Sequence, residues 1–215
     1  MKRTIRLFRG AILLALLAVG ALPAHATLLF DNLGVIDANS PFNETRSPAS
    51  GILARIDVGA SNVDINQFGV WGSQRTDGNI RFAIFEANGN RIYNSAILPQ
   101  VTAAQQWFDS PVFATLTLLA NTAYYFGLLS DQQFTYHWST LNPAFSQGGL
   151  SSRAGNIAGD NGNFSNFANP TLGDTCCFVT NATRVFGPGI DVPEPTTVAL
   201  LGLGVLGFRR RFARS

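Results

Sequence analysis

The central part of the sequence contains few charged residues and no lysine. Between residues 27 and 191 there are seven Arg and twelve acidic residues, which gives this stretch a net charge of −5. The remaining basic residues lie near the two ends, and they account for the overall charge of +2 and the pI of 8.8. Because nucleic-acid binding needs a basic surface, we do not expect this protein to bind nucleic acid.

Cysteine is almost absent as well. The two cysteines, Cys176 and Cys177, are adjacent, so no ordinary long-range disulfide can form within the chain. In an oxidising compartment they would close a strained vicinal ring or pair with another chain. Such a ring would act as a rigid turn, which is the simpler interpretation, or as a redox switch. With one distant histidine, His137, they do not make a zinc site, and we expect no metal and no cofactor.

The sequence also lacks the motifs of common hydrolases. It contains no Gly-x-Ser-x-Gly and no His-Glu-x-x-His. His137 lies in a predicted strand, within Tyr-His-Trp, and a hydrolase would need a nucleophile and an orienting acid beside it. We therefore expect a hydrogen-bonded histidine in a sheet and a protein that is not an enzyme, with hydrolase activity as the last of the alternatives.

The first 26 residues are organised like a secretory signal peptide. Four basic residues precede position 10, an apolar run covers 10–22, and small residues at 24 and 26 make a small-x-small cleavage site. We predict a signal peptide at 1–26 that is cleaved after Ala26. An uncleaved membrane anchor is the alternative.

The C-terminal residues combine a proline motif, an apolar run and a basic cluster. Pro193 and Pro195 disfavour helix before them, so a helix can begin only afterwards. The run at 196–208 contains only apolar residues, Gly and Thr, and as a helix it would rise about 20 Å, less than the ~30 Å hydrocarbon core. Basic residues that mark the cytoplasmic side follow it and can extend the span by snorkelling: Arg209, Arg210 and Arg211. A buried core helix is the alternative, but it would show regular polar positions.

These three parts, in this order, resemble the PEP-CTERM sorting signal of Gram-negative bacteria. The resemblance implies that Pro193, Glu194 and Pro195 are recognised by exosortase, a membrane protease-transpeptidase. It covers the sorting tail at 193–215, and a linker at 188–192 precedes the tail. We expect the chain to be held transiently in the cytoplasmic membrane by a short C-terminal transmembrane helix, and then to reach the cell surface or the medium.

Residues 27–187 are predicted to form one all-β domain. No long segment has apolar residues at helical spacing, whereas short runs alternate with period two between Gly, Asn, Asp or Pro. We expect an antiparallel β-sandwich of the jelly-roll type. The segment 52–139 is similar to β-sandwich domains that precede such tails, which implies no catalytic residues. The predicted strands are 52–58, 63–71, 80–85, 91–93, 115–119, 123–129, 134–139 and a last pair, 178–179 with 185–186.

Turn residues predict how some of these strands pair. Asn88-Gly89-Asn90 predicts a hairpin between 80–85 and 91–93. The turn at 120–122 predicts a second hairpin that joins the strands on either side of it. Gly and Asn dominate 147–175, where we expect long surface loops with one strand at most.

The function expected from the sequence is that of an exported, non-catalytic surface or extracellular-matrix protein. The tail's family is associated with exopolysaccharide and biofilm, and the Asn- and Gly-rich body suits a structural role. The alternative is a carbohydrate-binding module with Trp71, Trp107 and Trp138 as glycan contacts, although aromatic residues on strands more often belong to the core. The expected partners are exosortase, the cytoplasmic membrane and exopolysaccharide.

Overall fold

Short antiparallel strands make up most of the chain in the computed structural model, which describes residues 26–38, 42–46, 48–139, 145–152, 157–160, 164 and 180–189. Within these ranges α-helix is confined to a short segment, α2 (Leu33–Ala38). This confirms the all-β prediction. The strands are β1 (Thr27–Asp31), β2 (Phe42–Arg46), β3 (Ser50–Val58), β4 (Val63–Ile65), β5 (Gln67–Gln74), β6 (Gly78–Glu86), β7 (Arg91–Asn94), β8 (Leu98–Gln100), β9 (Ala103–Asp109), β10 (Leu116–Leu118), β11 (Ala123–Ser130), β12 (Phe134–Ser139), β13 (Phe145–Gln147), β14 (Leu150–Ser152), β15 (Ile157–Asp160), β16 (Thr180–Asn181) and β17 (Thr183–Gly187).

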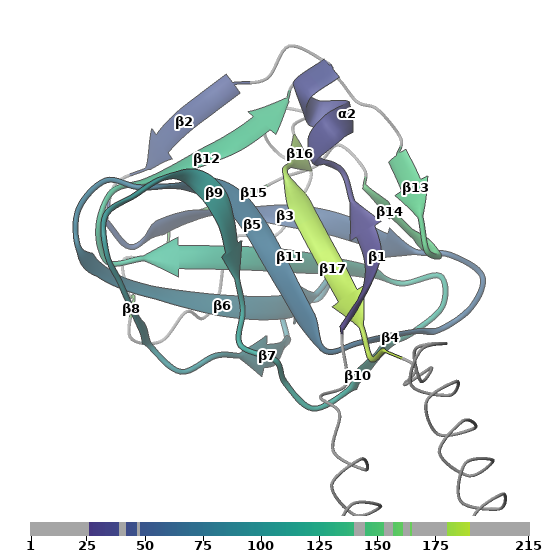
Figure 1. Cartoon of the computed structure of the whole chain (residues 1–215). Helices are drawn as coiled ribbons and strands as arrows, with labels where there is room; N and C mark the ends of the chain where they lie inside the picture. Colours follow the sequence, from purple (N-terminus) through teal and green to yellow (C-terminus); the bar gives the residue numbers. More distant parts are fainter. Residues whose placement is uncertain are drawn as a thin grey trace, which may run out of the picture. The chain divides into compact units, whose positions relative to one another are not determined.

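Two large sheets and a small ribbon organise these strands. Sheet A has the order β1-β17-β5-β12-β16, with β9 on the other edge of β5 and β2 on the other edge of β12. Sheet B has the order β13-β14-β3-β11-β6-β7, with β15 beside β3 and β8 beside β6. The ribbon pairs β10 with β4. In Figure 1, β5 and β17 of sheet A cross in front of β11 and β6 of sheet B.

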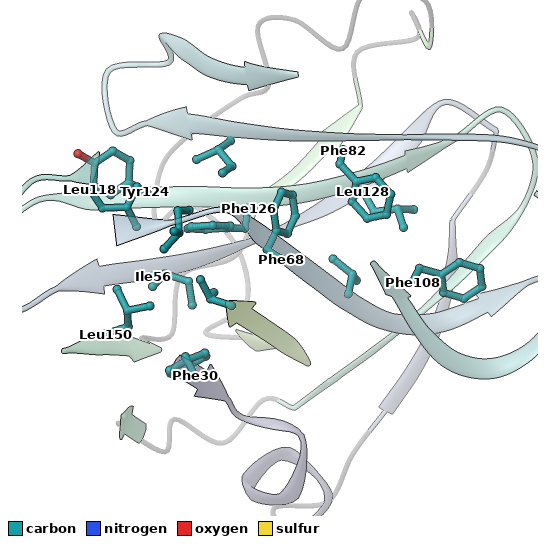
Figure 2. Close-up of a cluster of buried hydrophobic side chains, with 14 of the residues drawn as sticks. Phe30, Ile56, Phe68, Phe82, Phe108, Leu118, Tyr124, Phe126, Leu128 and Leu150 are labelled. Carbon is teal, nitrogen blue, oxygen red and sulfur yellow. The ribbon is translucent and has the colours of Figure 1, made fainter. Parts of the chain in front are cut away.

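The two sheets face each other across one hydrophobic core. Phe68 of sheet A meets Phe82 and Phe126 of sheet B edge to face, with ring centroids 5.5 and 5.1 Å apart (Figure 2). This geometry is favourable for aromatic rings, and full burial of such side chains is the main stabilising term of the fold. The core belongs to a compact unit, Ala26–Pro188. Its buried members are Phe30, Ile56, Val58, Ile65, Phe68, Val70, Ile80, Phe82, Ile84, Phe108, Leu118, Tyr124, Phe126, Leu128, Phe134, Tyr136, Leu150 and Val185.

Sheet B is also buried on its other face. Alternate residues of its central strands, among them Leu53, Phe85 and Tyr125, form a second buried cluster against which Phe164 packs. Burial on both faces explains why β6 reads as an almost continuous apolar run rather than as a clean alternation.

The first predicted hairpin is confirmed and the second is wrong. Strands β6 and β7 pair antiparallel around a turn in which Gly89 has a φ of 87°, a conformation that glycine adopts without strain. The strands on either side of 120–122 do not pair with each other. Both edges of β11 are taken by β3 and β6, and β10 pairs with β4 instead.

The predicted terminal pair and the predicted loops also need correction. Val185 and Phe186 lie in a strand, as predicted, but this strand, β17, has β1 and β5 at its two edges; the other half of the predicted pair, 178–179, lies outside the described residues. The stretch 147–175 contains β14 and β15 within its described part, more than the single strand expected. Strands β1, β2, β8, β9, β13 and β16 were not predicted.

The predicted signal peptide and the predicted transmembrane helix of 193–215 lie outside the described residues. In the part of the chain that the structure describes, no helix has both the length and the apolar character needed to cross a membrane.

The contact between β5 and β12 requires a glycine. Gly72 pairs with Tyr136, and a Cβ at position 72 would overlap both the Phe134 ring and the carbonyl oxygen of Thr135. The carbonyl belongs to the backbone of the neighbouring strand and cannot rotate away as a side chain would.

We expect Gly72→Ala to lower the free energy of unfolding by about 1–3 kcal/mol, because overpacking forces the two strands apart. Gly34→Ala is the matched control, since a Cβ in α2 would meet nothing within 4 Å. In a helix this change should be neutral or stabilising by up to about 1 kcal/mol. Urea denaturation measures both, and equal stabilities of the two variants would contradict the close-approach explanation.

An aspartate ties the loop before β9 to the turn before β6. Asp77 Oδ1 accepts hydrogen bonds from the Thr102 N–H at 2.6 Å and from the Thr102 hydroxyl at 2.8 Å. The backbone bond first, and the hydroxyl second, hold the pKa of Asp77 below its ordinary value of 3.8. The tie is therefore strongest at neutral pH and is lost as the pH falls through the lowered pKa.

We predict that Thr102→Val raises the pKa of Asp77 towards its ordinary value, because it removes one of the two donors. The backbone donor remains, so the return should be partial. NMR titration of the Asp77 carboxyl measures the shift. Thr76→Val is the control, since the Thr76 hydroxyl donates to Gln132 and not to Asp77; a similar shift in this variant would refute the assignment.

Candidate functional site

The outer face of sheet A carries most of the candidate residues. Strand β5 alternates, so Phe68 and Val70 enter the core while Gly69 and Trp71 point away from it. Strand β9 follows the same register, with Phe108 in the core and its neighbours facing out. We call the outward-facing surface formed by β2, β12, β5, β9 and β17 the outer face.

Two of the three predicted glycan-contact tryptophans form a pair on this face. Trp71 and Trp107 lie opposite each other on neighbouring strands, and their rings meet edge to face with centroids 5.4 Å apart. Both side chains are partly exposed. Trp138 is elsewhere, because it packs against the core between the two sheets. The three tryptophans therefore do not share one platform.

A charged pair borders the tryptophans. Arg184 of β17 and Asp109 of β9 lie on opposite sides of Gly69, and Arg184 Nε donates to Asp109 Oδ1 at 2.8 Å, with a second bond from Nη2 to Oδ2. A Cβ on Gly69 would collide with the Asp109 carboxylate, so glycine leaves the space in which the pair forms.

The same guanidinium also contacts aromatic rings. Arg184 Cζ lies 4.6 Å from the centroid of Trp107 and 5.1 Å from that of Phe186. Cation–π attraction and the bidentate ion pair together fix the position of Trp107. Since both charged groups are partly exposed, we expect their effect to be orientation more than stability.

His137 is the centre of a hydrogen-bonded chain on the same face. Its Nε2 donates to Asp37 Oδ1 at 2.7 Å, and its Nδ1 lies 2.9 Å from Asn43 Oδ1. Asn43 Oδ1 also accepts from Gln105 Nε2 at 3.0 Å. The histidine side chain is 7% exposed and the Asp37 side chain 56% exposed. Asp37 and Gln105, at the two ends of this series of hydrogen bonds, are therefore exposed to solvent, whereas His137 in its middle is buried.

Ala182 connects the histidine to the tryptophans. Its carbonyl accepts from the Trp71 N–H at 3.0 Å, and its N–H donates to the His137 carbonyl at 2.9 Å. Ala182 is fully buried, so it lies between the two strands as a small spacer. The aromatic pair and the polar chain are therefore neighbouring parts of one surface.

The polar members of this surface were not predicted from the sequence. Asp37, Asn43 and Gln105 lie in segments for which no element was predicted, and their partner His137 is about 100 residues distant from Asp37. The residues of β9, Ala-Ala-Gln-Gln-Trp-Phe-Asp, show no period-two alternation, so no such signal was available for this strand. No local signal relates α2 and β2 to β12.

Other candidates fall outside the described residues: Cys176, Cys177, Pro193, Glu194, Pro195, Arg209, Arg210 and Arg211. In the described ranges no group of three or more His, Cys, Asp or Glu side chains is placed to hold a metal ion.

The tail is the part of the chain that comparison with known proteins identifies. The family model of the PEP-CTERM protein-sorting motif matches residues 191–214. This chain carries a PEP-CTERM sorting signal. The resemblance seen in the sequence is thereby confirmed, while no curated protein matches the chain.

The PEP-CTERM signal indicates the protein's route. It implies export, anchoring in the membrane through the C-terminus and processing there by exosortase. The match covers only the sorting signal, at residues 191–214. It says nothing of the β domain, whose role has to be inferred from the residues of the outer face.

We predict that His137→Phe lowers the free energy of unfolding by about 1–2 kcal/mol, because the bond from a buried ring to Asp37 and the polar contact with Asn43 are lost. Urea denaturation measures the change. Asp37→Asn is the control, because an amide oxygen still accepts from Nε2 in an exposed position, and its effect should stay within about 0.5 kcal/mol. Wild-type stability of the His137 variant would show that the ring is not the centre of the chain.

Proposed function

We propose that this PEP-CTERM protein is a non-catalytic component of the cell surface or extracellular matrix of a Gram-negative bacterium. The observation that carries the proposal is the sorting signal at 191–214, which directs the chain to exosortase. A cleaved signal peptide at 1–26 would start the route, and a short transmembrane helix in 193–215 would hold the chain during processing. The exported body would be a jelly-roll-like sandwich.

The environment of His137 supports a role without catalysis. Both ring nitrogens lie at hydrogen-bond distance from protein side chains, Asp37 and Asn43, which agrees with a histidine that holds its neighbours in position. The carboxylate of Asp109 is likewise engaged, with Arg184. A low-charge surface of this kind suits a structural or adhesive component.

A second candidate function, carbohydrate binding, is favoured by the Trp71–Trp107 pair. Its members face away from the core, unlike most aromatic residues of the domain. Binding of exopolysaccharide would agree with a place in the matrix, so the two candidates are compatible.

We predict that deleting exosortase, or replacing Pro193, Glu194 and Pro195 by Ala, leaves the C-terminus intact and the protein in the membrane fraction. In the parent strain, intact mass should show loss of both ends and the protein should be found at the surface or in the medium. Val112→Ala, at an exposed position of the β domain outside the matched signal, is the control and should be processed normally.

Two results would overturn this proposal. An intact C-terminus in the membrane of the parent strain would make the tail a simple anchor. Normal release of the triple variant would show that the Pro-Glu-Pro motif does not direct the processing.

A further inference from the structure

We propose that the outer face of sheet A binds a neutral polysaccharide, with Trp71 and Trp107 under the sugar rings and Asp37, Asn43 and Gln105 on the hydroxyls. The inference rests on the proposed function, in which the body is exported to the cell surface or matrix. In place of Trp138, which packs against the core, it assigns the third contact to a set of polar side chains that the fold brings together.

The polar side chains are held in place before any ligand arrives. His137 binds Asp37 with one nitrogen and lies against Asn43 with the other, while Gln105 donates to the same Asn43 oxygen. Because these bonds restrict rotation, less conformational entropy is lost when a ligand binds.

Each of the three side chains also retains a group for a ligand. Asp37 Oδ2, Asn43 Nδ2 and Gln105 Oε1 have no hydrogen-bond partner among the described residues, and all three side chains are exposed. Together they offer two acceptors and one donor. A sugar with neighbouring hydroxyls, each of which both donates and accepts, matches this set.

The aromatic pair lies next to these groups. Gln105 is two residues from Trp107 on β9, and its bond to Asn43, the neighbour of His137, places it on the outer face. Ala182 joins the backbone of Trp71 to that of His137. Pyranose rings have apolar C–H faces and polar hydroxyl edges. An aromatic surface beside fixed planar polar groups can contact both at once.

The arrangement also indicates a polymer. The contact residues come from β9, β5, β2 and α2, and they form two adjacent groups. The polar group is joined by the bonds of His137 to Asp37 and Asn43 and of Gln105 to Asn43, and the Trp71–Trp107 pair forms the aromatic group. Two separate contact areas of this kind suit a chain of several sugar units better than a single one.

Charge at the hydroxyl-binding groups favours a neutral ligand over an acidic one, because Asp37, Asn43 and Gln105 include a carboxylate and no cation. The two arginines of the face have other partners: Arg184 is paired with Asp109, and Arg75 donates to the hydroxyls of Thr135 and Thr45. Asp37 presents a carboxylate oxygen to solvent, which would repel a uronate placed on the same hydroxyl-binding groups. A neutral hexose polymer avoids that repulsion.

The test uses the exported protein purified from its host and two probes: the neutral and the acidic exopolysaccharide fractions of the same host, separated by anion exchange. Isothermal titration calorimetry measures Kd. We expect binding to the neutral fraction that Trp71→Ala weakens by about tenfold or more, as loss of an aromatic anchor does. Gln105→Ala should weaken it about fivefold through one lost hydrogen bond.

Gln106→Ala is the matched control. Gln106 is exposed and adjacent to Gln105, but it pairs with Gly72 and its side chain alternates to the opposite face of β9. It should leave Kd unchanged. Gln105 makes no contact with the core, so its variant tests the face even if the tryptophan variant does not fold.

The inference is overturned if the wild-type protein does not bind the neutral fraction, if it binds only the acidic one, or if Gln105→Ala and Gln106→Ala bind equally. Such a result with normal export and processing would leave the proposed function standing. Conversely, a protein that binds the neutral fraction selectively but is never released from the membrane would support the proposed binding face and contradict the proposed export route.

Discussion

Strand β5 is the element through which both the core and the outer face are built, because its two sets of alternate residues serve different purposes. On one side Phe68 packs against rings of sheet B. On the other side Gly69 makes room for an ion pair and Trp71 meets Trp107. A shift of one residue in its register would exchange the two sets, so the buried side determines what the outer face can display.

The outer face differs from the core in the interactions that organise it. Its contacts are directional. The guanidinium of Arg184 forms a bidentate ion pair with Asp109, and each ring nitrogen of His137 lies at hydrogen-bond distance from one side-chain oxygen. Partly exposed interactions of this kind add little to stability, but they restrict where side chains point. A surface that is ordered without being tightly packed is well suited to recognition, and the close-packed core beneath it supplies the rigidity.

The elements that were predicted correctly have local causes. The turn at Asn88–Asn90 predicted the β6–β7 hairpin because Gly89 can adopt a positive φ. Strand β12 was predicted with its observed bounds, Phe134–Ser139, from alternation alone. The turn at 120–122 exists, with Asn121 at a φ of 57°, yet the hairpin predicted from it does not form. Both edges of β11 are occupied by strands distant in sequence, β3 and β6. No local sequence pattern indicates that these strands pair with β11 in preference to β10.

The candidate site shows the same limit. Trp71, Trp107 and Trp138 could be named from the sequence as aromatic residues, but the cross-strand contact of the first two and the packing of Trp138 against the core depend on pairing. The partners of His137 could not be named, because they come from segments about 100 and 94 residues away.

By itself the sequence determined the all-β architecture and the sorting signal, because each depends on residues that are contiguous in the chain. The strands follow from period-two alternation, and the sorting signal consists of Pro-Glu-Pro, an apolar run and arginines. Only the tertiary structure decided which strands pair and which side chains meet on the outer face. The physical reason is that strand pairing joins residues far apart in the chain, and their proximity depends on which edges remain free once the core has formed.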